Sequence, residues 1–562
     1  MEGGGPANRK KTAHGARAGG DERNPRKGGD PAGSLRAQAI RAGKGFAFDI
    51  DRLTACELIP IDIDARKRAH TLLDELLAEN TSARAGMITY PLVQSSLDEA
   101  ELLVFALVQL WSNSTVKRTK SLQISTLIDF SEYVPLAILM VKDGGGKDAV
   151  IRLRARWPKE CAWLGPQIQF DRMRTQYPLL PDAAELGPML WKLAVLQDRF
   201  GAWGGSFDVF SKPASHYKAG INQLSIKWDR TGRLTLARLR HALYWAAMSW
   251  SGKDVVAASL ITGDLKEQAR VPMFYPCRRM DSLQAIYKGT VEDLRFRIGQ
   301  ESLFASNPGA KRVPLDFLLV HTRRLVPPSQ FEPAPAATLY AGTRSCPTDT
   351  DMQRVVHELI DRLSAPWNLW DLKQLVMYTN LYTFYSVWGY FGLSTGCRAI
   401  LDPYLPLSVV SPLNRSALLD DKREEKERLV WIGEGLYAHM EFYEAYLRAT
   451  GLCYADRHPC WFLAKDGKPL EVRPGTVEPI LHSFLHGFPV NTNRRWMMNA
   501  LWDSGCPPEI VRMWAGHATA GNALWARGAT APYAQMRATL LAYLSPIIEY
   551  LGFVPIPGAN TR

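Results

Sequence analysis

The segment at residues 491–517, NTNRRWMMNALWDSGCPPEIVRMWAGH, constrains the fold of this chain more than any other. Its first part fits a helix that ends at Gly505, because glycine is common just after helix C-termini. Pro507 or Pro508 then begins a second helix, since proline is favoured at the first helical position. His517 follows a turn glycine. The segment therefore predicts two consecutive helices with a sharp turn between them.

The chain has 562 residues, which is more than one hydrophobic core usually serves. With 46% hydrophobic and 22% charged residues, the composition is that of a globular protein. A proline-rich stretch, VPPSQFEPAPAA, predicts a linker over residues 326–344. Apolar spacings of three and four then predict a mainly helical N-terminal region, 46–325, and a C-terminal domain, 345–562. We expect a mainly α fold with a small β-sheet.

Residues 1–45 form a basic, glycine-rich tail. It holds ten Lys and Arg against four Asp and Glu, so it carries +6 of the formal net charge of +12. Such a composition predicts disorder, and the tail is either a solubilising arm or a flexible electrostatic contact to DNA. The positive charge of the whole chain favours an anionic partner, with nucleic acid first and an acidic membrane surface second.

Membrane insertion and export are not indicated. No run of 18 apolar residues occurs, and no apolar segment follows the basic N-terminus at signal-peptide distance. The eight cysteines form no paired framework, which is typical of free thiols in a reducing compartment, and we expect a cytoplasmic protein. Cys453, His458 and Cys460 are close in sequence, but their spacing favours buried thiols over a zinc site.

Two further motifs precede the first segment. An aromatic and leucine-rich helix is expected over residues 369–393, and it leads to Thr395-Gly-Cys-Arg398. Residues 416–433, SALLDDKREEKERLVWIG, predict a β-hairpin with a polar tip that carries Lys422 and Lys426. On a hairpin a lysine can reach a bound phosphate, although a solvated tip explains the same residues.

Taken in order, these motifs resemble the catalytic domain of the tyrosine recombinase, or phage integrase, family. Arg398 matches the first arginine of the family in T-G-x-R, and Arg494 matches the second in H-x-x-R. His517 matches the second conserved histidine, which follows a glycine. The hairpin resembles the one that carries the catalytic lysine of the family, with Lys422 closest to that place and Lys426 as the alternative.

Two positions depart from the family pattern. Asn491 occupies the place of the first histidine, and an amide can hydrogen-bond a phosphate but cannot exchange a proton near neutral pH. Tyr533 is the expected nucleophile, yet it follows His517 at a greater distance than is usual in the family. It begins a helix after a proline, where the helix dipole favours a phosphate. Tyr543 shares an apolar face with its neighbours and is expected in the core.

The resemblance implies DNA strand transfer without metal or cofactor. Two guanidiniums, of Arg398 and Arg494, would hold the phosphate with charge-assisted hydrogen bonds. His517 would donate a further bond, and Lys422 would protonate the leaving 5′ oxygen. Tyr533 would form a covalent 3′-phosphotyrosine that stores the bond energy for rejoining. The implied function is a site-specific recombinase or integrase of a mobile element.

The resemblance also implies partners and a place in the cell. We expect double-stranded DNA with specific recombination sites as the partner, a tetramer on that DNA, no membrane, and association with the nucleoid. Residues 46–325 would contain a core-binding-like unit and an extra domain. Asn491 and the displaced Tyr533 leave open a catalytically impaired DNA-binding accessory protein, and a helical scaffold with coincidental motifs is the third alternative.

Overall fold

A computed structural model of the chain describes most residues of one compact unit, which runs from Leu53 to Arg562. The predicted tail at 1–45 lies outside the described residues. The described ranges are 53–83, 90–112, 116–120, 122–125, 136–139, 150–153, 174–175, 179–197, 207–228, 234–252, 254–263, 277–306, 329–335, 338, 340–342, 346–398, 404–419, 428–452, 461–517 and 533–559.

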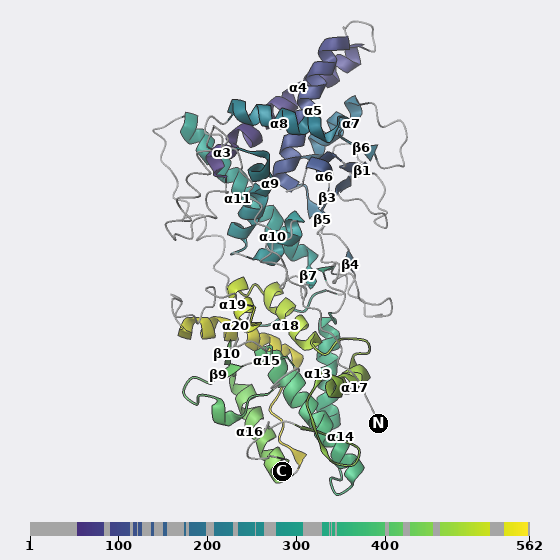
Figure 1. Ribbon diagram of the computed structural model, residues 1–562, viewed down its shortest axis with the longest axis vertical. Coiled ribbons are helices and arrows are strands. Elements are labelled where there is room, and N and C mark those ends of the chain that lie inside the picture. Colours follow the sequence, from purple (N-terminus) through teal and green to yellow (C-terminus); the bar gives the residue numbers. More distant parts are fainter. Residues whose placement is uncertain are drawn as a thin grey trace, which may run out of the picture. The chain divides into compact units, whose positions relative to one another are not determined.

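Helices form most of the described residues of the N-terminal region (Figure 1). They are α3 (Ala55–Ile59), the π-helix η1 (Pro60–Ala65), α4 (Arg66–Ala83), α5 (Tyr90–Ser112), α6 (Val116–Lys120), α7 (Gly187–Leu196), α8 (Ala214–Trp228), α9 (Leu236–Trp250), α10 (Val255–Thr262) and α11 (Met280–Ser306). The second half of α5 is buried on every side: all residues from Leu103 to Trp111 are buried, and the one polar residue among them, Gln109, donates a hydrogen bond to the hydroxyl of Thr119. Helices α4, α7, α8 and α9 pack around α5 and cover this buried half.

Short strands supplement these helices. One sheet has the order β5-β3-β2-β1-β6, and a second has the order β4-β8-β7. Their bounds are β1 (Gln123–Ser125), β2 (Leu136–Leu139), β3 (Val150–Leu153), β4 (Arg174–Thr175), β5 (Leu179–Pro181), β6 (Phe207–Asp208), β7 (Cys277–Arg279) and β8 (Tyr340–Gly342). The mainly helical fold with small sheets is confirmed, and the N-terminal region holds more strands than expected. Strand β8 occupies part of the predicted linker at 326–344.

The C-terminal region contains the two predicted helices and the predicted hairpin. Its elements are α13 (Asp349–Ser364), α14 (Leu372–Thr383), the π-helix η5 (Phe384–Phe391), α15 (Gly392–Thr395), the 3-10 helix η6 (Leu407–Val409), β9 (Ser416–Leu419), β10 (Arg428–Trp431), α16 (Glu434–Ala449), β11 (Trp461–Leu463), β12 (Pro469–Glu471), α17 (Pro474–Phe484), α18 (Thr492–Asp503), α19 (Pro508–Trp514) and α20 (Tyr533–Leu551). Strands β9 and β10 pair in antiparallel register, Arg428 with Leu419 and Trp431 with Ser416. Gly505, at φ +84°, lies between α18 and α19 as expected.

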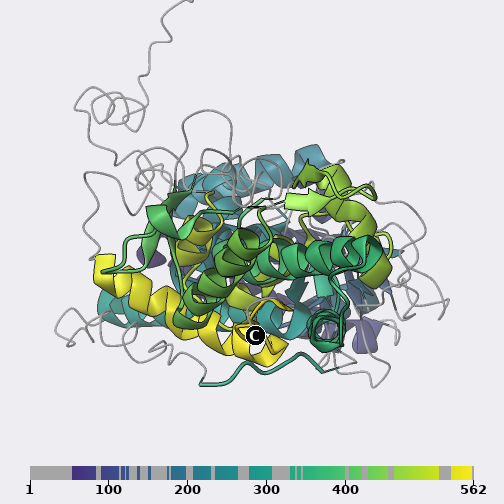
Figure 2. The same ribbon diagram turned by 90° about the horizontal axis from the view of Figure 1, so that it is seen from below.

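The core of this region is built on the continuous run α14–η5–α15. All residues from Phe384 to Thr395 are buried, and α13, α16, α17 and α20 pack against parts of the run. Figure 2 shows α20 in yellow alongside the green helices. After α20, the chain is held by tyrosine hydroxyls: Tyr385 donates to the carbonyl of Val554 at 2.8 Å, and Tyr382 donates to that of Ile556 at 2.5 Å. The C-terminal segment is therefore part of this core.

Within the described residues, none of the helices is both long and apolar enough to span a bilayer. Among the described cysteines, Cys277, Cys346, Cys397 and Cys506 are buried free thiols, as predicted. Residues 453–460, with the Cys453, His458 and Cys460 cluster, lie outside the described residues.

Candidate functional site

The turn that carries Arg398 is fixed by its glycine. Gly396 ends α15 with φ +65°, a left-handed conformation that costs any residue with a Cβ. A Cβ here would also lie 3.0 Å from the ring of Trp514. The indole Nε1 of Trp514 donates to the carbonyl oxygen of Ser394 at 2.9 Å. The turn after α15 thus packs directly on the end of α19, and Arg398 follows it, partly buried.

Helix α18 places Arg494 beside this turn. Asn491 is its N-cap and is partly exposed, and its side chain makes no capping hydrogen bond. Asn493 locks the first turn of the helix in place, because its Nδ2 donates to the carbonyl of Trp388 at 2.7 Å. A Cβ on Gly392 would lie 2.6 Å from that nitrogen, so glycine permits the close approach of the two helices. Arg494 then enters the protein interior with 0% exposure.

The guanidinium of Arg494 joins the two motif turns. Its Nη1 donates to the carbonyl of Gly396 at 2.6 Å, and its Nη2 donates to the carbonyl of Ala515. The same Nη2 lies 3.2 Å from Nε2 of His517. An arginine nitrogen can only donate, so Nε2 accepts and the neutral imidazole carries its proton on Nδ1. Arg494 therefore contacts His517 directly and binds the turn that leads to Arg398.

Arg428 is a second buried arginine of the site, and the sequence did not indicate it. It is the first residue of β10 and is 1% exposed. Its Nη1 donates to the carbonyl of Thr395 at 2.7 Å and to the carbonyl of Trp514 at 2.6 Å. In the sequence, Arg428 follows the charged stretch 420–427 and reads as part of a solvated hairpin tip. Its only signal is the apolar LVW that follows it.

The same strand reaches the expected nucleophile. Tyr533 begins α20, is partly buried, and packs its ring edge-on against Trp431 of β10, with centroids 5.3 Å apart. Its hydroxyl is buried and has no hydrogen-bond partner among the described residues. Tyr543 is 2% exposed and lies in the core as predicted.

The hairpin connection and one loop cannot be placed in this site. Lys422 and Lys426 lie outside the described residues, as do residues 518–532 between His517 and Tyr533. The ends of the connection are fixed, however, since Leu419 and Arg428 are paired residues of β9 and β10.

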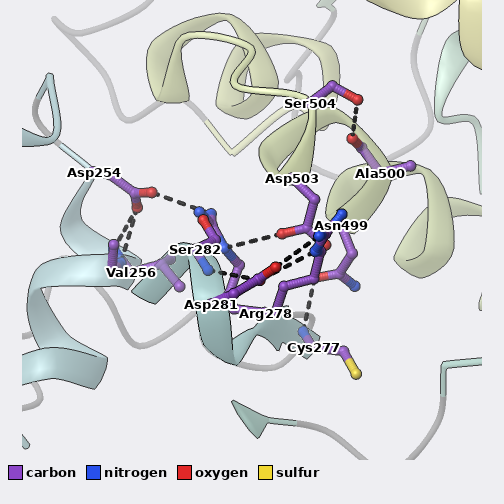
Figure 3. A network of polar contacts seen from close by, with 12 residues as sticks. Asp254, Val256, Cys277, Arg278, Asp281, Ser282, Asn499, Ala500, Asp503 and Ser504 are labelled. Carbon is purple, nitrogen blue, oxygen red and sulfur yellow. Dashed lines mark hydrogen bonds and ion pairs between the residues drawn. The ribbon is translucent and has the colours of Figure 1, made fainter. Parts of the chain in front are cut away.

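The far end of α18 is held by a buried charge network (Figure 3). Asn499 accepts a hydrogen bond from the backbone nitrogen of Cys277 at 2.7 Å. Arg278, which is 2% exposed, lies 3.6 Å from Asp503 and 3.1 Å from Asp254. Asp503 ends the helix, where the dipole disfavours a carboxylate, so the cation offsets an unfavourable charge. The network joins α18 to β7 and to the N-terminus of α10, which Asp254 caps.

No family model, no curated protein and no solved structure matches this chain. Its function is therefore inferred from the residues of the site and from their contacts.

Proposed function

We propose that the chain is a site-specific DNA strand transferase of the tyrosine recombinase type. The observation that supports it is the convergence of the motifs: Arg494 binds the turn that carries Arg398 and the turn that carries His517. Tyr533 begins the helix that packs on the neighbouring hairpin. The formal net charge of +12 suits a polyanionic partner.

Arg398 and Arg494 differ in whether they can contact a phosphate directly. Arg398 is partly exposed, so its side chain can meet a phosphate at the surface. His517 is partly exposed as well, but its Nδ1 is buried, so the ring has to turn before it can donate to that phosphate. Arg494 is fully buried and binds carbonyl oxygens, so it supports the two turns from the interior and does not contact the phosphate. Its positive charge still favours a phosphate above the turns, since charge acts over several ångströms in a medium of low dielectric constant.

Cleavage in this site would proceed by attack of the Tyr533 hydroxyl oxygen on phosphorus, with the phenolic proton released to water. The bond between phosphorus and the 5′ oxygen breaks, and Lys422, or Lys426, gives that oxygen a proton. The covalent phosphotyrosine keeps the bond energy, so the reverse reaction rejoins a strand. Because the hydroxyl is buried beside Trp431, DNA binding has to move the start of α20 before attack.

A second function is favoured by the same hydroxyl. A tyrosine enclosed beside Trp431, together with Asn491 in place of a histidine, fits a DNA-binding accessory protein that has lost cleavage. In either case the proposed partner is duplex DNA with specific sites, bound by a tetramer of this chain, and the proposed location is the nucleoid of the cytoplasm.

A trapping experiment separates the two functions. Duplexes with a randomised central segment are selected for binding, nicked near the bound position, and incubated with the protein before denaturing electrophoresis. We expect an adduct with the wild type, none with Tyr533→Phe, and an unchanged amount with the control Tyr543→Phe. Binding without any adduct would support the accessory function, and an adduct with Tyr533→Phe would assign the nucleophile elsewhere.

A further inference from the structure

Arg428 and Arg494 bind neighbouring carbonyls of the same two turns. Arg428 donates hydrogen bonds to the carbonyl oxygens of Thr395 and Trp514. Arg494 donates to the carbonyl of the next residue in each turn, which is Gly396 in one and Ala515 in the other. The two guanidiniums thus form successive links between the chain before Arg398 and the chain before His517. Both arginines are buried, so water cannot replace these bonds when one is lost.

The two links are chemically different. Arg494 donates through two nitrogens, Nη1 to one turn and Nη2 to the other. Arg428 donates to both turns through the single nitrogen Nη1. A lysine ammonium also presents its three donors on one nitrogen. The single nitrogen of a lysine can therefore stand in for Nη1 of Arg428 in these two bonds, whereas it cannot stand in for both Nη1 and Nη2 of Arg494.

The position of Arg428 connects these links to the rest of the site. It is paired with Leu419 at the base of the hairpin connection that contains Lys422. Three residues further along β10, Trp431 contacts the ring of Tyr533. One short strand therefore contacts both the turns of Arg398 and His517 and the ring of Tyr533.

We propose that Arg428 is a positioning residue of the strand-transfer site, which fixes the two motif turns against the hairpin through its Nη1. This rests on the proposed function for its effect on catalysis, but its effect on the turns is independent of catalysis. A shift of about 1 Å in a reacting group can cost about 100-fold in rate. Loss of the Nη1 bonds should therefore slow adduct formation without weakening DNA binding.

The test compares Arg428→Met, Arg428→Lys and the control Arg448→Met, whose side chain is 60% exposed on α16. Single-turnover adduct formation and DNA affinity are measured on the nicked duplexes. We expect Arg428→Met to be about 100-fold slower at unchanged affinity, and Arg428→Lys to recover most of that loss. The Arg448→Met control should match the wild type. Equal rates for Arg428→Met and wild type, or a lysine variant no better than methionine, would overturn the proposal.

Hydrogen exchange of the free proteins gives a readout that needs no activity. Amides of residues 394–398 and 514–517 should exchange faster in Arg428→Met than in wild type, and Arg428→Lys should restore their protection. If the wild type forms no adduct, the proposed function fails while the exchange result still decides the role of Arg428. Unchanged exchange in Arg428→Met would overturn that role even in an active enzyme.

Discussion

Trp514 lies against Gly396 so closely that a Cβ on the glycine would be 3.0 Å from its ring. The substitution Gly396→Ala therefore has two costs in folding free energy. One is the left-handed backbone at φ +65°, and the other is the displacement of the indole. The backbone alone costs about 1–2 kcal/mol. We expect Gly396→Ala to lower the free energy of unfolding by more than that, as measured by urea denaturation.

Gly451 provides the matched control for this change. It has φ +70°, and a Cβ built on it would meet nothing within 4 Å. Gly451→Ala should therefore show the backbone cost of about 1–2 kcal/mol by itself. Equal losses at both positions would mean that the contact between Gly396 and Trp514 does not restrict the turn.

Arg494→Lys should be poorly tolerated, because one ammonium cannot reach both carbonyls that the guanidinium binds. One buried carbonyl, of Gly396 or of Ala515, would be left without its donor. Such a loss costs about 1–3 kcal/mol in the free energy of unfolding. Denaturant titration should show this loss for Arg494→Lys and a smaller one for Arg428→Lys. The reverse order would contradict the assigned bonds.

Removal of the Tyr533 hydroxyl should leave stability nearly unchanged. The hydroxyl is buried without a partner among the described residues, so Tyr533→Phe removes no observed hydrogen bond and relieves a desolvated group. The control Tyr382→Phe removes a bond to the carbonyl of Ile556 and should cost about 1 kcal/mol. Thermal or urea unfolding measures both. A large loss in Tyr533→Phe would reveal a partner of this hydroxyl.

Arg278→Met should destabilise the chain strongly. It removes the cation between Asp254 and Asp503, two carboxylates whose side chains are 6% and 11% exposed. Removing one partner of a buried ion pair costs about 3–5 kcal/mol. The double variant Arg278→Met with Asp503→Asn should recover part of this loss in urea unfolding, because one of the stranded charges is gone. A double variant with no recovery would show that Asp503 does not depend on Arg278.

Stability should also depend on pH through His439. Burial lowers the pKa of this histidine from 6.5 to about 3. Its Nδ1 accepts from the backbone nitrogen of Ile556, its Nε2 lies 2.9 Å from the Ser386 hydroxyl, and the rings of Tyr382 and Tyr385 face it. The folded state therefore holds the neutral imidazole, whereas the unfolded chain takes up a proton near pH 6.5.

The proton taken up by the unfolded chain determines the direction in which stability changes with pH. Between pH 6.5 and pH 3 the unfolded state binds one more proton at this residue, so stability falls as the pH is lowered through that window. The slope from one proton is about 1.4 kcal/mol per pH unit at most. The difference in unfolding free energy between wild type and His439→Asn should shrink from pH 7.5 to pH 5. A constant difference would show that His439 is accessible to protons in the folded state.

Local rules predicted the parts of the site that repeat common helix signals. Gly505 and Pro508 mark the end of α18 and the start of α19, and the hairpin is visible from the two apolar runs around its charged centre. The helix expected over 369–393 exists, but part of it is the π-helix η5. All residues of η5 are buried, so the sequence has no alternation of polar and apolar faces from which a π-helix could be distinguished from an α-helix.

The short strands and the role of Arg428 could not be predicted, because both depend on contacts between residues far apart in the sequence. Strand β1 pairs with β2 on one side and with β6 on the other, and β6 has only two residues. Strands this short carry too few residues for an alternating pattern. Arg428 was missed for a related reason: its partners are carbonyls of Thr395 and Trp514, and a backbone acceptor leaves no mark on the sequence.

Helix α18 has a mechanical consequence for the chain. Its twelve residues make it about 18 Å long, with Arg494 in its first turn and Asp503 at its last residue. An intact helix of this length moves as one body, so it cannot shift at one end and stay still at the other. A displacement of β7, and with it of Arg278, must therefore also move Arg494 and the two turns whose carbonyls it binds. The C-terminal end of α18 thus couples the position of β7 to the geometry of the site.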